Sequence, residues 1–197
     1  MPLIADWSRR VRSKRSIARN GAVVTKFLER TRQMPAPRVL ELGTRQVDRA
    51  VSSRRDGWVP HAAAFVGVDI APGPGVDLAA DAHRLAASVG EDAFDAVIAC
   101  SVFEHLERPW VAATEIARVL HRGGLVFVQT HQTFPLHAHH HDYWRFSTEA
   151  LRLIFDDAGL ETVDAAYEFR ARILAARTPR AFFQHAYLNV CFLGEKP

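Results

Sequence analysis

The chain has 197 residues, of which 48% are hydrophobic and 24% charged, and its formal net charge at pH 7 is +3. This composition is typical of a globular domain and excludes an intrinsically disordered chain. No apolar run reaches the ~18 residues of a membrane span, and the N-terminus lacks the apolar stretch of a signal peptide, so we expect a soluble, cytoplasmic protein.

The N-terminal segment is strongly basic. Residues 1–38 carry ten Lys or Arg and two acidic residues, a net charge of +8, whereas the rest of the chain carries −5. Apolar residues in this segment recur at helical spacing, with Arg residues on the other face. We therefore predict a basic helical cap at residues 1–35 and a main domain at residues 36–197. Such helices either lie over a ligand site, where they favour an anionic partner, or present a solvated face.

Short apolar runs in the main domain predict seven strands. They lie at residues 39–42, 65–70, 76–78, 94–100, 125–130, 162–169 and 186–193. The first five strands, with helices between them, are typical of a parallel sheet that is covered on both faces. The last two could pair antiparallel as an edge hairpin. The predicted fold class is α/β, with a doubly wound, mostly parallel, seven-stranded Rossmann-like sheet and an antiparallel edge strand.

Two helices of the main domain have clear boundaries in the sequence. Pro109 can begin a helix that runs to Leu120, where Gly123 and Gly124 would end it. Ser147 can cap a second helix that Gly159 stops. Cys100 and Cys191 lie inside apolar, strand-like runs, so we predict two buried structural thiols and neither a disulfide nor a catalytic cysteine.

Three acidic residues fall at or just beyond the ends of predicted strands: Glu41, Asp69 and Asp81. In open parallel sheets, ligands bind outside the carboxyl ends of the strands. Three carboxylates there suit a ligand with a cationic group, a ribose diol and an adenine. A loop-capping carboxylate at Asp69 and a helix N-cap at Asp81 are the alternatives. A nicotinamide cofactor is disfavoured because the GxGxxG fingerprint is missing.

Six segments follow one another along the chain in a recognisable order. They are VLELG at 39–43, VGVDI at 66–70, Asp81-Ala82, CSVFEHL at 100–106, ARVLHRGGLVFV at 117–128 and HDYWRFSTEALRLIFDDAGL at 141–160. In this order they resemble the class I S-adenosylmethionine-dependent methyltransferases, and most of all the small bacterial ones of the type 11 group that act on small molecules. The resemblance covers about residues 36–193 and implies S-adenosylmethionine as the cofactor.

The resemblance also implies which residues bind that cofactor. Glu41 and Gly43 would line its methionine end, and Asp69 would accept hydrogen bonds from both ribose hydroxyls. Asp81 would accept from the adenine amino group, next to the backbone N–H of Ala82. The full implied set is Glu41, Gly43, Thr44, Asp69, Ile70, Asp81, Ala82, Ser101 and Val102.

One segment departs from the pattern of that family. The glycine-rich turn usually reads Gly-x-Gly-x-Gly, whereas this chain has Gly43-Thr44-Arg45-Gln46-Val47. A cation at Arg45 near a sulfonium is unfavourable unless its side chain points to solvent or to the carboxylate of the cofactor. A domain that has lost its cofactor and serves as a binding module is therefore one alternative.

Five histidines lie within residues 131–141, directly after the fifth predicted strand. In the related fold this loop faces the substrate, and imidazole is a base whose pKa needs no tuning. We expect the loop to act as a substrate lid, and a plain surface loop or a metal-dependent enzyme built on these histidines is the alternative. The candidate catalytic residues are His105, His131, His141 and Tyr143, with Tyr143 or Arg145 meeting the substrate; we assign no metal ligand.

These expectations combine into one predicted activity. The chain would transfer a methyl group from S-adenosylmethionine to oxygen, in preference to nitrogen, of a small metabolite, and the basic N-terminal helices would favour an anionic one. A nucleic acid is disfavoured as the acceptor because no Asn-Pro-Pro-Tyr-like motif follows the fourth strand, where Cys100-Ser101-Val102-Phe103 stands instead. The oligomeric state, including a homodimer, stays open.

Overall fold

The computed structural model of the protein describes residues 21–46, 54–138, 140–173 and 185–197. The helices predicted within residues 1–20 lie outside the described residues. No helix in the described ranges is long and apolar enough to cross a membrane.

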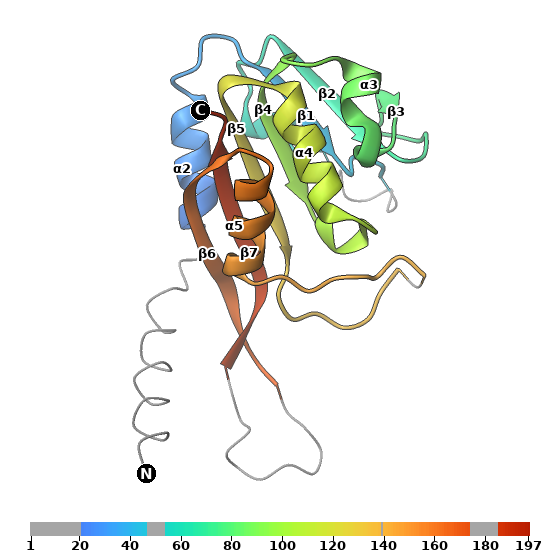
Figure 1. Ribbon diagram of the computed structural model, residues 1–197, viewed down its shortest axis with the longest axis vertical. Helices are drawn as coiled ribbons and strands as arrows, with labels where there is room; N and C mark the ends of the chain where they lie inside the picture. Colours follow the sequence, from blue (N-terminus) through green and yellow to red (C-terminus); the bar gives the residue numbers. More distant parts are fainter. Residues whose placement is uncertain (1–20, 47–53, 139, 174–184) are drawn as a thin grey trace.

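A seven-stranded sheet forms the centre of the molecule, in the order β3-β2-β1-β4-β5-β7-β6 (Figure 1). The strands from β3 to β5 are parallel, and β7 runs antiparallel between β5 and β6. The predicted α/β sheet with its antiparallel edge is therefore confirmed. The bounds are β1 Arg38–Leu42, β2 Ala64–Asp69, β3 Leu78–Ala79, β4 Phe94–Cys100, β5 Leu120–His131, β6 Glu161–Arg172 and β7 His185–Glu195.

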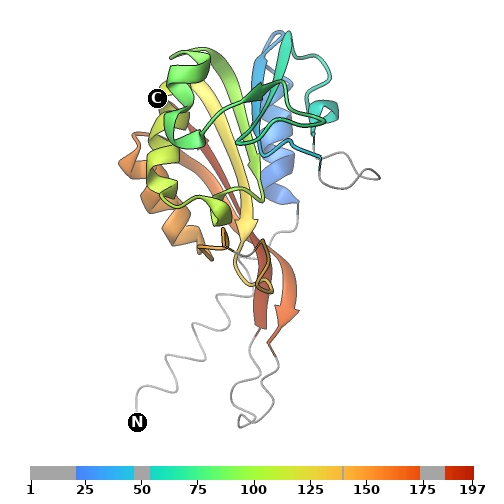
Figure 2. The same cartoon turned by 90° about the vertical axis from the view of Figure 1, so that its right-hand side faces the viewer.

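Helices cover both faces of this sheet (Figure 2). One face packs against α4 and α5, with α3 beside α4, and the other face packs against α2. Alternation along the strands divides the core accordingly, since Leu40 and Val97 face the first layer whereas Val39 and Ile98 face the second. The bounds are α2 Ala22–Thr31, α3 Leu85–Val89, α4 Pro109–Val119 and α5 Thr148–Asp157, with short 3₁₀ turns η1 Asp56–Trp58, η2 Ala82–Arg84 and η3 Phe103–His105.

Helix α2 is held on the sheet by polar contacts as well as by its apolar face. Val23 and Phe27 are fully buried in the second core layer. The backbone N–H of Gly21 donates to the buried carboxylate of Glu168 at 2.8 Å, which places a negative charge at the N-terminus of the helix. Lys26 forms an ion pair with Asp164 of β6 at 2.7 Å. Helix α2 therefore shares a core with the main domain.

The connections between strands differ in kind. The β2–β3 link is a turn of residues 70–77, and its Pro and Gly residues at 72–75 suit a turn. The boundary between α4 and β5 differs from the prediction. Helix α4 ends at Val119, and Gly123 and Gly124 lie inside β5 instead of terminating the helix. The ladder between β4 and β5 is irregular here, and Gly123, with φ +75°, takes a left-handed conformation that suits glycine in such a bulge.

Two other local predictions are confirmed. The Ser147 side chain accepts a hydrogen bond from the backbone N–H of Ala150 and so caps α5. Cys100 and Cys191 are buried free thiols. Burial raises the pKa of Cys100 to about 12, which keeps that thiol protonated and unreactive at neutral pH.

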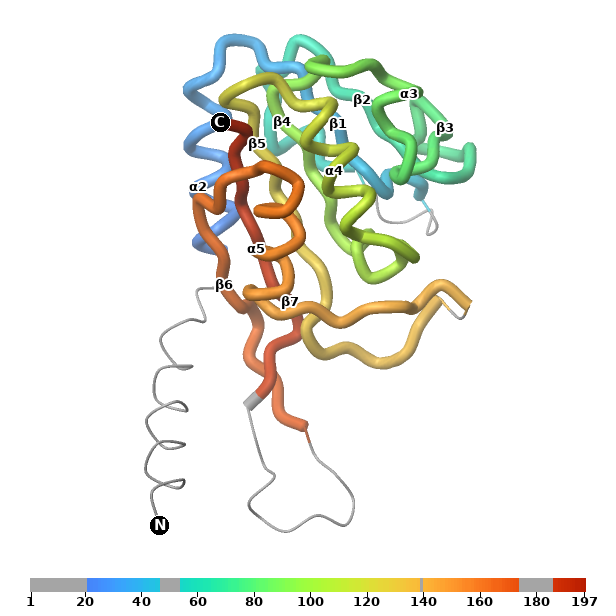
Figure 3. Tube along the Cα trace, in the orientation of Figure 1, coloured from blue at the N-terminus to red at the C-terminus, as the bar shows by residue number. Residues whose placement is uncertain are grey.

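The chain leaves β5 at His131 and reaches α5 through a long loop, residues 132–147, here called the β5–α5 loop. Figure 3 shows this loop passing below the end of β5 and the N-terminal end of α4. Hydrogen bonds fix it there: the backbone N–H of Tyr143 donates to the carbonyl of Glu104, and Trp144 Nε1 donates to the carbonyl of Leu106 at 2.8 Å. The loop therefore lies at the carboxyl end of the parallel strands.

Candidate functional site

A cavity of about 640 Å³ opens at the carboxyl ends of β1, β2 and β4. Its walls come from those strand ends, from η2, from the β4–α4 connection and from the β5–α5 loop. Ten of the thirteen residues proposed from the sequence for cofactor binding or catalysis line it. They are Gly43, Asp69, Ile70, Asp81, Ala82, Ser101, Val102, His105, His141 and Tyr143.

Gly43 follows β1 at the inner wall of the cavity. Its φ of +77° is left-handed, and a Cβ at this position would lie 2.5 Å from Val102 Cγ2. Its backbone N–H donates to the carbonyl of Val68 at 2.8 Å, which extends the parallel pairing of β1 and β2 by one residue. Only glycine allows β1 to end this close to Val102.

Asp69 ends β2 with its carboxylate held by two backbone groups. One oxygen accepts from the N–H of Arg45 at 3.1 Å, and the other accepts from the N–H of Ala71 at 3.2 Å. A carboxylate oxygen has two lone pairs, so both oxygens can still accept from a diol at this edge. The side chain of Arg45 lies beside it, with Nε 3.8 Å from the carboxylate. The cation that departs from the family pattern thus lies against Asp69.

Asp81 caps the short turn η2. Its Oδ1 accepts from the backbone N–H of His83 at 2.9 Å and lies 2.7 Å from Nδ1 of the same residue. Partial burial opposes the charged form, but the hydrogen bonds from His83 outweigh it, so the pKa of Asp81 is lowered. The capping alternative is therefore correct, and the same side chain also lines the cavity.

Two of the expected cofactor residues do not line the cavity. Glu41 lies on the opposite side of β1 from Leu42, because successive strand residues alternate, and it is fully buried. Its carboxylate pairs with Arg55 Nη1 at 2.7 Å and accepts from the Arg55 N–H at 2.8 Å. Burial raises the pKa of Glu41, although the bonds from Arg55 act in the other direction. Thr44 is also fully buried and packs against Gly67 and Gly75.

Ser101 and Val102 close the cavity where β4 ends. The φ of Ser101 is +54°, a left-handed conformation that is unfavourable for a residue with a Cβ. Its N–H still donates to the carbonyl of Gln129 on β5, at 2.8 Å, so the sheet holds the strained residue in place. Ser101 lies at the cavity wall, and strained residues of this kind cluster at functional sites.

The β5–α5 loop is held by an internal ion pair. Arg145 binds the Asp142 carboxylate through both Nη atoms, at 2.5 and 2.9 Å, and also donates to the carbonyls of Phe134, Pro135 and Trp144. Of the two residues offered for substrate contact, Arg145 has its donors engaged within the loop, whereas Tyr143 lines the cavity. Arg145, together with the backbone N–H of His137, lowers the pKa of Asp142 well below its usual range.

Tyr143 and His141 bring the same loop to the cavity. His141 Nδ1 and Tyr143 Oη are 3.3 Å apart, and that hydroxyl donates to Glu107 at 3.3 Å. Desolvation raises the pKa of Tyr143, and the charge and hydrogen bond of Glu107 add to the effect. Tyr143 therefore stays protonated at neutral pH, so it can donate a hydrogen bond but is a poor base.

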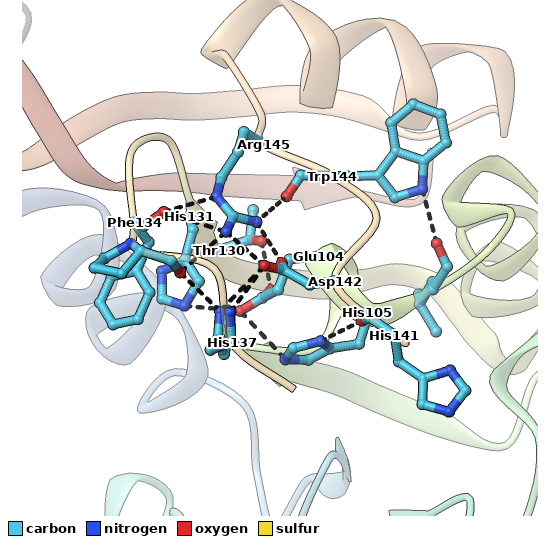
Figure 4. A network of polar contacts seen from close by, with 12 residues as sticks. Glu104, His105, Thr130, His131, Phe134, His137, His141, Asp142, Trp144 and Arg145 are labelled. Carbon is cyan, nitrogen blue, oxygen red and sulfur yellow. Dashed lines mark hydrogen bonds and ion pairs between the residues drawn. The ribbon is translucent and has the colours of Figure 1, made fainter. Parts of the chain in front are cut away.

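His131, the remaining predicted base, does not line the cavity and belongs to a cluster that Figure 4 shows. This Glu104 cluster consists of Glu104, His105, His131 and His137. Glu104 is fully buried, Thr130 Oγ1 donates to its Oε2 at 2.6 Å, and His131 Nε2 lies 3.0 Å from its Oε1. Glu104 was not predicted from the sequence. Its only signal there is that it is acidic and stands beside His105, just after an apolar strand.

Part of this site lies in a segment that matches a known domain family. Residues 58–128 match the model of the Methyltransferase domain family. That segment runs from η1 through β2, β3 and β4 into β5, so it contains Asp69, Asp81 and Ser101. None of the curated proteins matches the sequence.

Solved structures share the fold at low sequence identity. The chain is similar to 1,6-didemethyltoxoflavin-N1-methyltransferase of Burkholderia thailandensis, solved with bound 1,6-didemethyltoxoflavin and S-adenosylhomocysteine (16% identity, 98% of this chain and 87% of that chain covered, TM-score 0.60). It is also similar to S-adenosylmethionine-dependent methyltransferases of Mesorhizobium loti (13%, 89% and 99%, TM-score 0.59) and Archaeoglobus fulgidus (14%, 88% and 94%, TM-score 0.59). These likenesses extend over most of each chain, beyond the segment that the family model matches.

Proposed function

We propose that this chain, a class I S-adenosylmethionine-dependent methyltransferase by its domain match and its fold, methylates an oxygen atom of a small metabolite. The main support for the proposal is the cavity at the strand ends. Gly43, Asp69 and Asp81 all line it, and they follow one another along the chain as the family pattern requires. S-adenosylmethionine supplies an activated methyl group on a sulfonium, so the protein mainly has to align the acceptor with it.

The residues around the cavity fit this cofactor. Asp69 would hold the ribose hydroxyls, since backbone N–H groups already orient its carboxylate and leave lone pairs for a diol. Asp81 and the backbone of Ala82 would bind the adenine, with Ile70, which is 71% exposed, available to cover the ring. Gly43, Ser101 and Val102 would border the methionine end.

The β5–α5 loop supports an acceptor site next to the cofactor site. His105 and His141 line the cavity at its loop side, and His105 Nδ1 donates to the carbonyl of His141 at 2.7 Å. That bond places the proton on Nδ1 and leaves Nε2 as the basic nitrogen. Methylation of a hydroxyl requires loss of its proton whereas a neutral amine has a lone pair already, so adjacent imidazoles favour oxygen as the target.

The parts of the prediction that concern residues 1–20 stay predictions. Helix α2 lies on the sheet face, and none of its residues lines the cavity, so the expected position over the ligand site does not hold for this helix. An anionic acceptor, the cap at residues 1–35, a cytoplasmic location and a homodimer rest on the sequence alone.

Calorimetric titration with S-adenosylhomocysteine tests the proposal first. We expect micromolar binding to the unmodified chain and a loss of roughly 10- to 150-fold in Asp69→Ala, since charge-assisted hydrogen bonds contribute about 1.5–3 kcal/mol. Asp157→Ala, which removes an exposed carboxylate at the end of α5, should leave the affinity unchanged. A folded protein that does not bind S-adenosylhomocysteine would contradict the proposal.

The acceptor atom requires a second experiment. The enzyme is incubated with methyl-labelled S-adenosylmethionine and pooled hydroxyl- or amine-bearing metabolites, and labelled products are identified by mass spectrometry and NMR. A methyl ether or ester is the expected product, and label only on nitrogen would overturn the preference for oxygen.

A further inference from the structure

Four side chains that bind metals in proteins converge beneath the β5–α5 loop, as Figure 4 shows. Glu104 and His105 come from η3, His131 ends β5, and His137 comes from the loop. We propose that Glu104, His131 and His137 bind one divalent transition-metal ion, for which zinc is the best match. Two imidazoles and one carboxylate are a ligand set that zinc uses in open, catalytic sites.

The distances fit one ion. One ligand atom from each of Glu104, His131 and His137 lies within 4.8 Å of the other two. Two ligands that each lie ~2.1 Å from a zinc ion are separated by about 3.0–3.5 Å, depending on the angle at the metal. The 3.0 Å between His131 Nε2 and Glu104 Oε1 falls at this separation, and small shifts of His137 would bring in the third ligand.

The second observation is the state of Glu104 Oε1. This oxygen is buried, and within the described part of the chain no group forms a hydrogen bond with it, although His131 Nε2 is only 3.0 Å away. With the proton of His131 on Nδ1, neither Nε2 nor this oxygen carries a hydrogen, so two acceptor atoms lie 3.0 Å apart with no hydrogen bond between them. Two ligands of one ion lie at such a separation. A buried carboxylate without a compensating cation is strongly unfavourable.

The imidazoles are also oriented as metal ligands usually are. Nδ1 of His137 lies 3.2 Å from the carbonyl of Pro135, and Nδ1 of His131 lies 3.2 Å from Asn189 Oδ1. Because a carbonyl oxygen only accepts, these contacts place a proton on Nδ1 and leave the Nε2 lone pair for an ion. Stacking of Phe134 on His131, at 4.1 Å between ring centroids, restricts the imidazole further.

The position of the cluster suggests what the ion would do, and this part rests on the proposed function. His105 belongs both to the cavity wall and to the cluster, with Nε2 3.9 Å from Glu104 Oε1. An acceptor hydroxyl bound to the ion would have a much lower pKa. Its O–H bond would break, the proton would pass to the basic Nε2 of His105, and the electron pair would stay on the oxygen that accepts the methyl group.

Zinc titration of chain without a polyhistidine tag, treated with a chelator beforehand, tests the site. We expect one ion per chain, and affinities reduced at least ~100-fold in Glu104→Gln and in His137→Gln, since even an outer-sphere partner is worth 10- to 100-fold. His121→Gln, which changes an exposed histidine of β5 outside the cluster, should bind as the unmodified chain does. His137→Gln lies in the loop, so it reports on the site even where a change at buried Glu104 prevents folding.

Three results would overturn the metal site: no zinc binding, unchanged affinity in both variants, or an equal loss in His121→Gln. Titration of the same samples with S-adenosylhomocysteine separates this proposal from the proposed function. Asp69→Ala should lose the nucleoside and keep zinc, whereas Glu104→Gln should lose zinc and keep the nucleoside. If the chain binds zinc but not S-adenosylhomocysteine, the metal site is supported and its role in methyl transfer is not.

Discussion

At the scale of single residues, the cavity depends on one glycine and on the strained end of β4. Gly43 lets β1 end against Val102, and Ser101 takes a left-handed conformation directly before Val102. The two strand ends therefore approach each other more closely than ordinary residues allow. The rest of the family's glycine-rich turn is absent, and Arg45 lies beside Asp69 in its place.

Gly43→Ala should weaken S-adenosylhomocysteine binding at least ~10-fold. The left-handed φ is unfavourable by ~1–2 kcal/mol for a residue with a Cβ, and the new Cβ would displace Val102 as well. The double variant Gly43→Ala, Val102→Ala should recover part of the affinity, because it removes the contact and leaves only the backbone strain. Calorimetry on the three proteins measures this coupling.

Gly159→Ala is the matched control for backbone strain. Gly159 follows the end of α5 with a φ of +82°, yet none of the residues that the structure describes lies within 4 Å of its Cβ position. It should lower stability and leave the nucleoside affinity unchanged. An affinity of Gly43→Ala equal to that of the unmodified chain would show that the strand ends can separate.

At the scale of elements, the β5–α5 loop is built as a fixed wall. Arg145 and Asp142 clamp it internally, and Phe146 packs beside Phe103 in the first core layer. The loop therefore positions His137 and His141 without help from a ligand. A lid that closes over the substrate, as the sequence suggested, would have to move this clamped segment or only its tip.

The stability of the fold should depend on pH through the ion pair between Asp142 and Arg145. The pKa of Asp142 is lowered in the folded chain from an ordinary value of 3.8, so its charged form stabilises the fold. That contribution is present above about pH 4 and is lost as the pH falls through the lowered pKa. The melting temperature of Asp142→Asn should therefore lie below that of the unmodified chain at pH 7, and the gap should shrink below pH 4.

Asp157→Asn, an exposed carboxylate near the end of α5, is the comparison variant for this series. It should melt like the unmodified chain throughout. A gap for Asp142→Asn that stays constant from pH 7 to pH 3 would mean that the carboxylate charge does not stabilise the loop.

At the scale of the whole molecule, two core layers lie on opposite faces of one sheet. The layer against α2 contains Val23 and Phe27 together with Phe127 of β5, whose ring centroid lies 5.5 Å from that of Phe27. The edge strand β6 contributes Glu168 and Asp164, which bind Gly21 and Lys26 and so hold α2. Removal of α2 would expose the apolar face of β5 and β7, so the helix belongs to the same cooperative unit.

Phe27→Ala should therefore lower the free energy of unfolding by about 3–5 kcal/mol, the usual effect of removing a buried phenylalanine. Denaturant unfolding should remain a single transition at a lower midpoint. Leu153→Ala, at an apolar residue of α5 that is 63% exposed, should change it by less than about 0.5 kcal/mol. An unchanged main transition in Phe27→Ala would mean that α2 folds as a separate cap.

The sequence by itself determined the sheet, the helices and most of the cavity. Strands such as residues 94–100 are apolar along most of their length because both faces of the sheet are covered. Such runs are visible without a structure. Asp69 and Asp81 were identified because they follow strands, and all parallel strands end at the same edge. Local sequence is sufficient for features of this kind, since each depends on its own strand and the turn that follows.

Only the tertiary structure decided which side chains meet. Glu41 belongs to Arg55 and not to the cavity because the strand alternates, and Arg145 belongs to Asp142 because the loop folds on itself. The Glu104 cluster joins residues from η3, β5 and the β5–α5 loop, up to 33 positions apart in the chain. Such contacts depend on how elements pack against one another, and no local pattern in the chain records that packing.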